Sequence, residues 1–112
     1  MKLASLKAGK DGCLIVVSRD LARAVDASAI APTLLDAVER WATCSPKLLS
    51  LYEALNAGTA PGAFAFDARQ SAAPLPRAPQ WCDGSAFLNH GELMQAAFIL
   101  PPLPEMETVP LM

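Results

Sequence analysis

The chain has 112 residues and a mass of 11.8 kDa, which is enough for one domain with one modest core. Its formal net charge of −2 and pI of about 5.2 give no electrostatic footprint for nucleic acid or anionic lipid, so we expect neither as a partner. Hydrophobic residues make up 53% of the chain and charged residues 18%, which leaves open whether part of the surface meets a partner.

No uncharged apolar run approaches the roughly 20 residues that a membrane-spanning helix needs, and residues 1–6 resemble a strand rather than a signal peptide. We therefore expect a cytoplasmic protein.

Cys13, Cys44 and Cys82 are widely spaced, include no C-x-x-C pair and have one histidine in the chain to help them bind zinc. We expect three free thiols, buried or half-buried, in a reducing compartment.

The first 27 residues alternate between apolar runs and turn signals, which predicts a three-stranded antiparallel meander. The predicted strands are residues 1–6, 13–18 and 21–25. Lys10-Asp11-Gly12 supplies an Asp-Gly turn, and the apolar, mostly β-branched run of residues 14–17 is typical of a well-buried strand.

Two helices are predicted next. Pro32 suits a first helical turn, and the apolar stripe that follows, which includes Trp41, predicts a helix ending near Cys44. Ser45-Pro46 predicts the start of a second helix that stops at Gly58, with Tyr52 on its apolar stripe. Trp41 and Tyr52 are expected in the core, because aromatic residues on helical stripes are usually core residues.

Eight of the ten prolines follow residue 58, which predicts largely extended, irregular backbone in the second half. Residues 85–98 have room for regular structure, either a short helix or a strand followed by a helix. The predicted fold class is therefore α+β: an antiparallel β-meander packed on a helix pair, then a proline-rich, largely extended C-terminal segment. The predicted domains are residues 1–70 and 71–112.

His90 is the one side chain whose ordinary pKa suits a base near neutrality, and Asp83 and Glu92 are its nearest carboxylates in sequence. The other acids of the second half, Asp67, Glu92, Glu105 and Glu107, have spacings that match no known oxygen cage and are expected to be surface charges. A nucleophilic enzyme built on Cys82 and His90 is not favoured, because neither an orienting third group nor an oxyanion loop is evident.

Several segments carry a resemblance to a known family. They are residues 1–6 with 14–20, residues 51–56, the proline-rich residues 73–81, and Asp83 to His90 with the residues that follow. In these segments the chain resembles the fumarylacetoacetate hydrolase family, whose members cleave carbon–carbon bonds of diketo acids with a divalent metal and a histidine base. The resemblance covers the N-terminal domain and the start of the catalytic domain.

The resemblance implies that His90 is the catalytic base and that Asp83 is a metal ligand, for Mg²⁺ or Ca²⁺, in the full-length enzyme. Ca²⁺ typically takes about six to eight oxygen ligands, which one aspartate cannot supply. The family's further carboxylates and most of its barrel come downstream, so we expect this chain to be a truncated N-terminal piece that is inactive alone. The expected partners are its own missing catalytic domain, a small diketo acid from tyrosine or other aromatic catabolism, and a second copy in a homodimer. An alternative is a stand-alone, non-catalytic interaction or dimerisation module.

Overall fold

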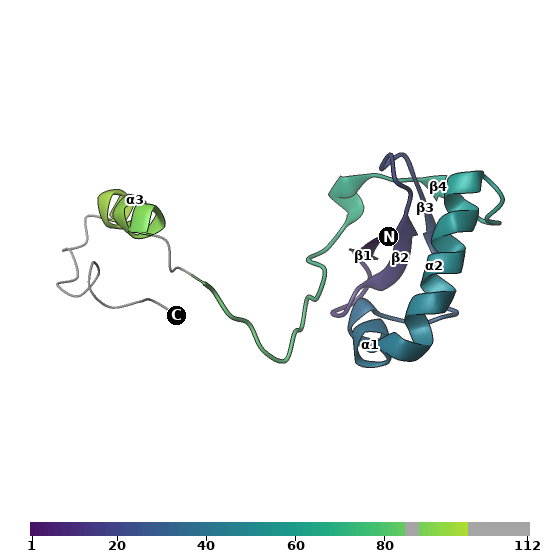
Figure 1. The fold of residues 1–112 in the computed structure, drawn as a ribbon, viewed down its shortest axis with the longest axis horizontal. Helices are drawn as coiled ribbons and strands as arrows, with labels where there is room; N and C mark the ends of the chain where they lie inside the picture. The colour runs from purple at the N-terminus through teal and green to yellow at the C-terminus, as the bar shows by residue number, and fades with distance from the viewer. Residues whose placement is uncertain (85–87, 99–112) are drawn as a thin grey trace. The chain divides into compact units, whose positions relative to one another are not determined.

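The computed structural model describes residues 1–84 and 88–98 (Figure 1). The chain divides into two compact units, Met1–Pro79 and Gln80–Met112, and each is described by itself. The predicted proline-rich segment beyond residue 98 lies outside the described residues. The predicted domains, residues 1–70 and 71–112, stay a prediction.

The first unit contains a four-stranded antiparallel sheet in the order β1-β2-β3-β4. Its strands are β1 (Lys2–Leu6), β2 (Cys13–Val17), β3 (Arg23–Asp26) and β4 (Phe64–Ala65). The first three strands confirm the predicted meander. The third begins two residues later than predicted, because Leu21 lies in the turn with a φ of 62°. The two-residue β4, which pairs with β3, was not predicted.

Two helices follow the meander: α1 (Leu34–Glu39) and α2 (Trp41–Ala57). The Thr33 side chain caps α1 by accepting a hydrogen bond from the Asp36 amide at 3.1 Å, so Pro32 precedes the cap rather than opening the helix. Gly58 ends α2 in a left-handed conformation with a φ of 78°, which confirms the predicted stop.

The predicted boundary between the helices was wrong. The break is at Arg40, whose φ of −115° and ψ of 37° are not helical, and Pro46 lies inside α2. Proline in this position removes only one helix hydrogen bond, and the helix continues because its buried face packs against the sheet. The proline signal at residue 46 therefore marks no helix start.

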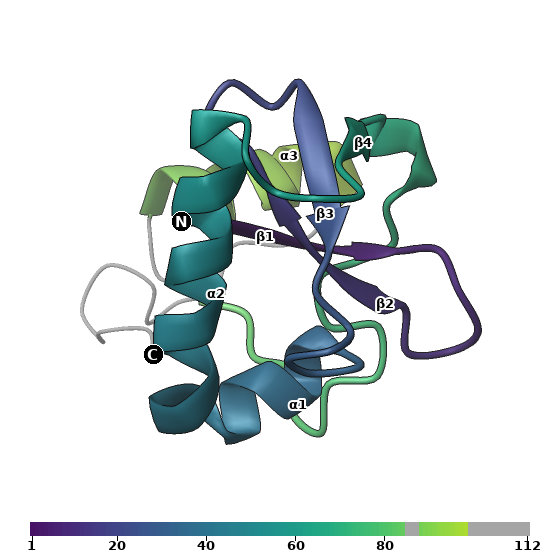
Figure 2. The same ribbon diagram turned by 90° about the vertical axis from the view of Figure 1, so that its right-hand side faces the viewer.

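The main core lies between one face of the sheet and the two helices (Figure 2). It joins Leu14, Val16 and Val25 of the sheet to Leu48 and Leu55 of α2. A second, smaller cluster on the other face of the sheet contains Ile15, Val17 and Ala24. Strand β2 is thus buried on both faces, which confirms the predicted well-buried strand.

Trp41 does not belong to this core, which corrects the sequence-based prediction. Its exposed fraction is 43%, whereas that of Tyr52 is 7%. Because α2 begins at Trp41, the positions that face the sheet are Cys44, Leu48, Tyr52 and Leu55. Trp41 and Leu49 are therefore left on an outer face of the helix pair.

The second unit contains α3 (Leu88–Phe98), so the described part of residues 85–98 is helical. None of the residues of α3 is buried. No helix in the described part of the chain has the length and apolar character needed to cross a bilayer.

Candidate functional site

The two residues predicted to carry chemistry lie in the second unit. His90 is the third residue of α3 and is exposed, and Asp83 is exposed in the segment before residues 85–87, which lie outside the described residues. Glu92 is on α3 two positions after His90, and residues two apart on a helix do not face each other. The catalytic role of His90 and the metal-binding role of Asp83 stay predictions.

A metal ion would need several ligating side chains close together. Within residues 1–84 and 88–98, no group of three or more His, Cys, Asp or Glu side chains is arranged to hold one. Asp67 is paired with Arg69 at 3.1 Å, and Glu92 is exposed. The predicted acids Glu105 and Glu107 lie outside the described residues. The possible metal ligands among the described residues therefore do not by themselves fit Mg²⁺ or Ca²⁺, which need several oxygen ligands.

The cysteines are free thiols with three different environments. Cys44 is buried in the main core and Cys13 is partly buried, as expected. Burial raises the pKa of the Cys13 thiol, and the nearby Asp26 carboxylate raises this pKa further. Cys82 is exposed, contrary to the prediction of buried or half-buried thiols, because it lies in the irregular segment after Pro79.

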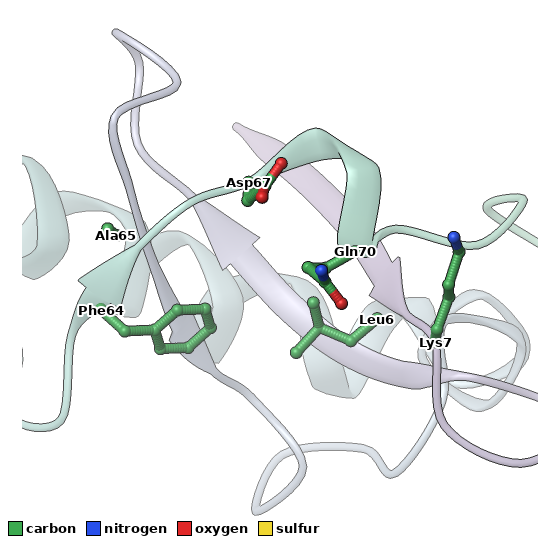
Figure 3. Close-up of a pocket in the computed structure, with 6 residues that line it drawn as sticks. All are labelled: Leu6, Lys7, Phe64, Ala65, Asp67 and Gln70. Carbon is green, nitrogen blue, oxygen red and sulfur yellow. The ribbon is translucent and has the colours of Figure 1, made fainter.

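The first unit has a pocket beside the smaller apolar cluster, where Leu6 packs (Figure 3). Its volume is about 260 Å³. The residues that line it come from the end of β1, from β4 and from the segment after β4: Leu6, Lys7, Phe64, Ala65, Asp67 and Gln70. Figure 3 shows the Phe64 ring and the Leu6 side chain on the two sides of this hollow.

The charged residues of this pocket already have partners. The Lys7 ammonium donates to the Arg69 carbonyl at 2.9 Å, and the Asp67 carboxylate accepts from the Arg69 amide and guanidinium. The hydrogen bond from the Arg69 side chain lowers the pKa of Asp67. Phe64 supplies an aromatic wall with an exposed fraction of 37%. The pocket is thus lined by the apolar side chains of Leu6, Phe64 and Ala65 and by the Gln70 amide, and its charged residues are paired.

After the short 3-10 helix η1 (Ala68–Gln70), the chain returns to the β1–β2 hairpin. The Lys7 amide donates to the Gln70 carbonyl at 2.9 Å, and the Ala72 amide donates to the Ser5 carbonyl at 2.8 Å. The Ser5 hydroxyl donates to the Pro74 carbonyl at 2.7 Å. Residues 71–74 therefore cover the outer edge of β1 near its end.

The segment that returns to the β1–β2 hairpin ends in an ion pair. The Arg77 guanidinium donates to both carboxylate oxygens of Asp11, at 2.6 and 2.8 Å. The hydrogen bond from Arg77 holds the pKa of Asp11 below its ordinary value, and the charge of Lys10 acts in the same direction. The same bond raises the pKa of Arg77. No sequence motif signals this pair, because its partners are joined only when the hairpin and the proline-rich segment meet.

Comparison with known families gives a match in the same part of the chain. The family described as "Fumarylacetoacetase N-terminal domain 2" matches residues 1–77. The matched region contains the sheet, the helix pair, the pocket and the Arg77–Asp11 ion pair, and it ends before Asp83 and His90. A search of curated proteins found no match. The chain belongs to the fumarylacetoacetase family, through its N-terminal domain.

Proposed function

We propose that this chain is the N-terminal portion of a fumarylacetoacetate hydrolase-type enzyme, which cleaves a carbon–carbon bond of a diketo acid by hydrolysis. The observation that carries the proposal is the family match over residues 1–77, which coincides with nearly all of the first unit, Met1–Pro79. In this proposal the first unit is structural. Its partner is a catalytic domain that supplies the rest of the site.

His90 is proposed as the general base that takes a proton from the attacking water. Its exposure on α3 supports this role, because an exposed imidazole is accessible to a substrate held by a partner domain. A positioned base contributes roughly 10²- to 10⁴-fold in rate. The proposal also includes a cytoplasmic location, where the free thiols of this chain would stay reduced.

A divalent cation, Mg²⁺ or Ca²⁺, is part of the proposed enzyme, yet the described residues do not fit it alone. Asp83 would be one oxygen ligand, and the others would come from outside the described residues. We therefore expect this chain by itself to be inactive toward diketo acids, with or without added metal.

The proposal is tested by assaying the native protein, purified from its source, with an acylpyruvate and Mg²⁺ or Ca²⁺. Hydrolysis is expected, and a His90→Ala variant should lose roughly 10²- to 10⁴-fold in kcat. Asn89→Ala is the matched control, because Asn89 is the exposed neighbour of His90 on α3. An absence of hydrolysis, or hydrolysis that His90→Ala leaves unchanged, would overturn the proposal.

A second candidate is a non-catalytic interaction or dimerisation module. It is favoured by the apolar side chains that α3 exposes, since exposed apolar groups on one helix are typical of a surface that meets a partner. These are Leu88, Leu93, Met94 and Phe98. Hydrolysis that depends on His90 would exclude this candidate as the sole function.

A further inference from the structure

We propose that residues 71–77 form a releasable clasp on the β1–β2 hairpin. The Arg77–Asp11 ion pair holds this clasp closed, and its opening lengthens the tether between the first unit and Asp83. The contact that begins the clasp is an antiparallel bridge between Leu6 and Ser71. The contact that ends it is the ion pair itself. This inference goes beyond the proposed function, and only its consequence for Asp83 depends on that function.

Few contacts hold the clasp between these two ends. The Ala72 amide and the Pro74 carbonyl each make one hydrogen bond to Ser5, and Leu75 packs against the edge of the main core. Pro74 and Pro76 have no amide hydrogen, so the segment cannot continue as a full strand beside β1. A segment held in this way separates from the edge without unfolding the sheet.

Two features of the closed clasp favour opening. The ion pair is exposed, with side-chain exposed fractions of 60% for Arg77 and 45% for Asp11, so salt screens it. Among the described residues, the Ser71 hydroxyl is the one buried side-chain polar group without a hydrogen-bond partner. A buried hydroxyl without a partner is unfavourable, and opening returns it to water.

Opening changes how far Asp83 reaches from the domain. With the clasp closed, the tether from Ala78 to Cys82 spans at most roughly 18 Å. With the clasp open, the tether from Ser71 to Cys82 spans at most roughly 43 Å. Effective concentration depends on how well the length of a tether matches the distance that it must span. Closing the clasp therefore changes how far Asp83 reaches from the residue that anchors the tether.

The test is amide hydrogen exchange of the 112-residue chain, measured by NMR without substrate. The reporter is the Ala72 amide, which the clasp bonds to Ser5, and the reference is the Val16 amide, which lies in the sheet interior. We expect Ala72 to exchange faster than Val16. Asp11→Asn should raise Ala72 exchange by ~2- to 5-fold, and about 1 M salt should bring the unmodified chain toward the same rate.

Two further variants make the test specific. Asp67→Asn is the matched control, because it removes an exposed carboxylate–arginine pair outside residues 71–77 while asparagine can still cap η1, and it should leave Ala72 exchange unchanged. Ser71→Ala removes the buried hydroxyl and should slow Ala72 exchange at least about 5-fold.

The clasp is overturned if Ala72 and Val16 exchange at one rate, because the segment would then open only by global unfolding. It is also overturned if Asp11→Asn acts no more strongly than Asp67→Asn, or if Ser71→Ala leaves Ala72 unchanged. None of these results depends on hydrolase activity. Failure of the clasp is thus distinguishable from failure of the proposed function.

Discussion

The Ser5 hydroxyl donates a 2.7 Å hydrogen bond to the carbonyl of Pro74, a residue 69 positions later in the chain. Ser5 is almost fully buried, with an exposed fraction of 1%. This bond ties the first strand of the domain to the last part of the region that matches the family. The N-terminal domain is therefore closed by a contact between its two ends.

Ser5→Ala should lower the free energy of unfolding by about 1 kcal/mol, because it removes this bond and leaves the Pro74 carbonyl without it. The measurement is urea denaturation followed by circular dichroism. Ser50→Ala, on the exposed side of α2, is the control and should change stability by less than about 0.5 kcal/mol. Equal effects of the two substitutions would contradict the role of the Ser5 bond.

Gly12→Ala should be more destabilising than Gly9→Ala. Both glycines have positive φ, 74° and 57°, and alanine in such a conformation costs about 1–2 kcal/mol. An added Cβ at Gly12 would also lie 2.9 Å from the Ser5 Cβ, whereas nothing lies within 4 Å at Gly9. Thermal unfolding of the two variants measures the difference, and the same midpoint for both would show that Ser5 imposes no close contact.

Leu48→Ala and Leu49→Ala form a matched pair on α2. Leu48 is fully buried in the main core, and Leu49 is 46% exposed. We expect a loss of about 2–5 kcal/mol for Leu48→Ala, from lost burial and a cavity, and less than about 1 kcal/mol for Leu49→Ala. Chemical denaturation checks both values. A larger loss at Leu49 would mean that the described face of α2 is not the one that packs on the sheet.

The stability of the domain should fall in acid. The pKa of Asp11 is lowered in the folded chain, chiefly by the hydrogen bond from Arg77. Hydrogen bonds from Ser18 and Ser28 lower the pKa values of Asp20 and Asp26 in the same way. A lowered folded-state pKa gives stability that is present above the unfolded-state pKa of about 3.9 and is lost as pH falls through the folded-state value.

The contribution of the ion pair to this pH dependence is measurable by itself. In thermal unfolding from about pH 6 to pH 2, Asp11→Asn should make the fall in melting temperature shallower than in the unmodified chain. Arg77→Gln should do the same, because it removes the main cause of the Asp11 shift. A pH dependence that neither variant changes would contradict this assignment.

Sequence reasoning succeeded where local patterns decide the structure. The apolar run of residues 14–17 specifies a buried strand, and Gly58 specifies a helix end because glycine readily adopts the left-handed conformation. It failed at the boundary between α1 and α2. Proline favours the first turn of a helix, but at Pro46 the packing of α2 against the sheet overrides this local preference. The exposure of Trp41 was missed for the same reason, since the true helix start changes which positions face the sheet.

The features that depend on distant residues had no local signal. Strand β4 is only two residues long and forms by pairing with β3. The Arg77–Asp11 pair and the pocket between Leu6 and Phe64 join segments about sixty residues apart in sequence, so spacing does not predict them. The assignments of Asp83 and His90 rest on family resemblance, and the family match over residues 1–77 does not extend to them.

The central proposal is that this chain is the N-terminal portion of a metal-dependent diketo-acid hydrolase. The most direct measurement is peptide mass spectrometry of the native protein from its source cells, searching for sequence translated beyond Met112. We expect such peptides, in a protein whose downstream region contains further Asp and Glu residues able to complete a metal site. A native protein that ends at Met112 would contradict it and would favour the interaction module.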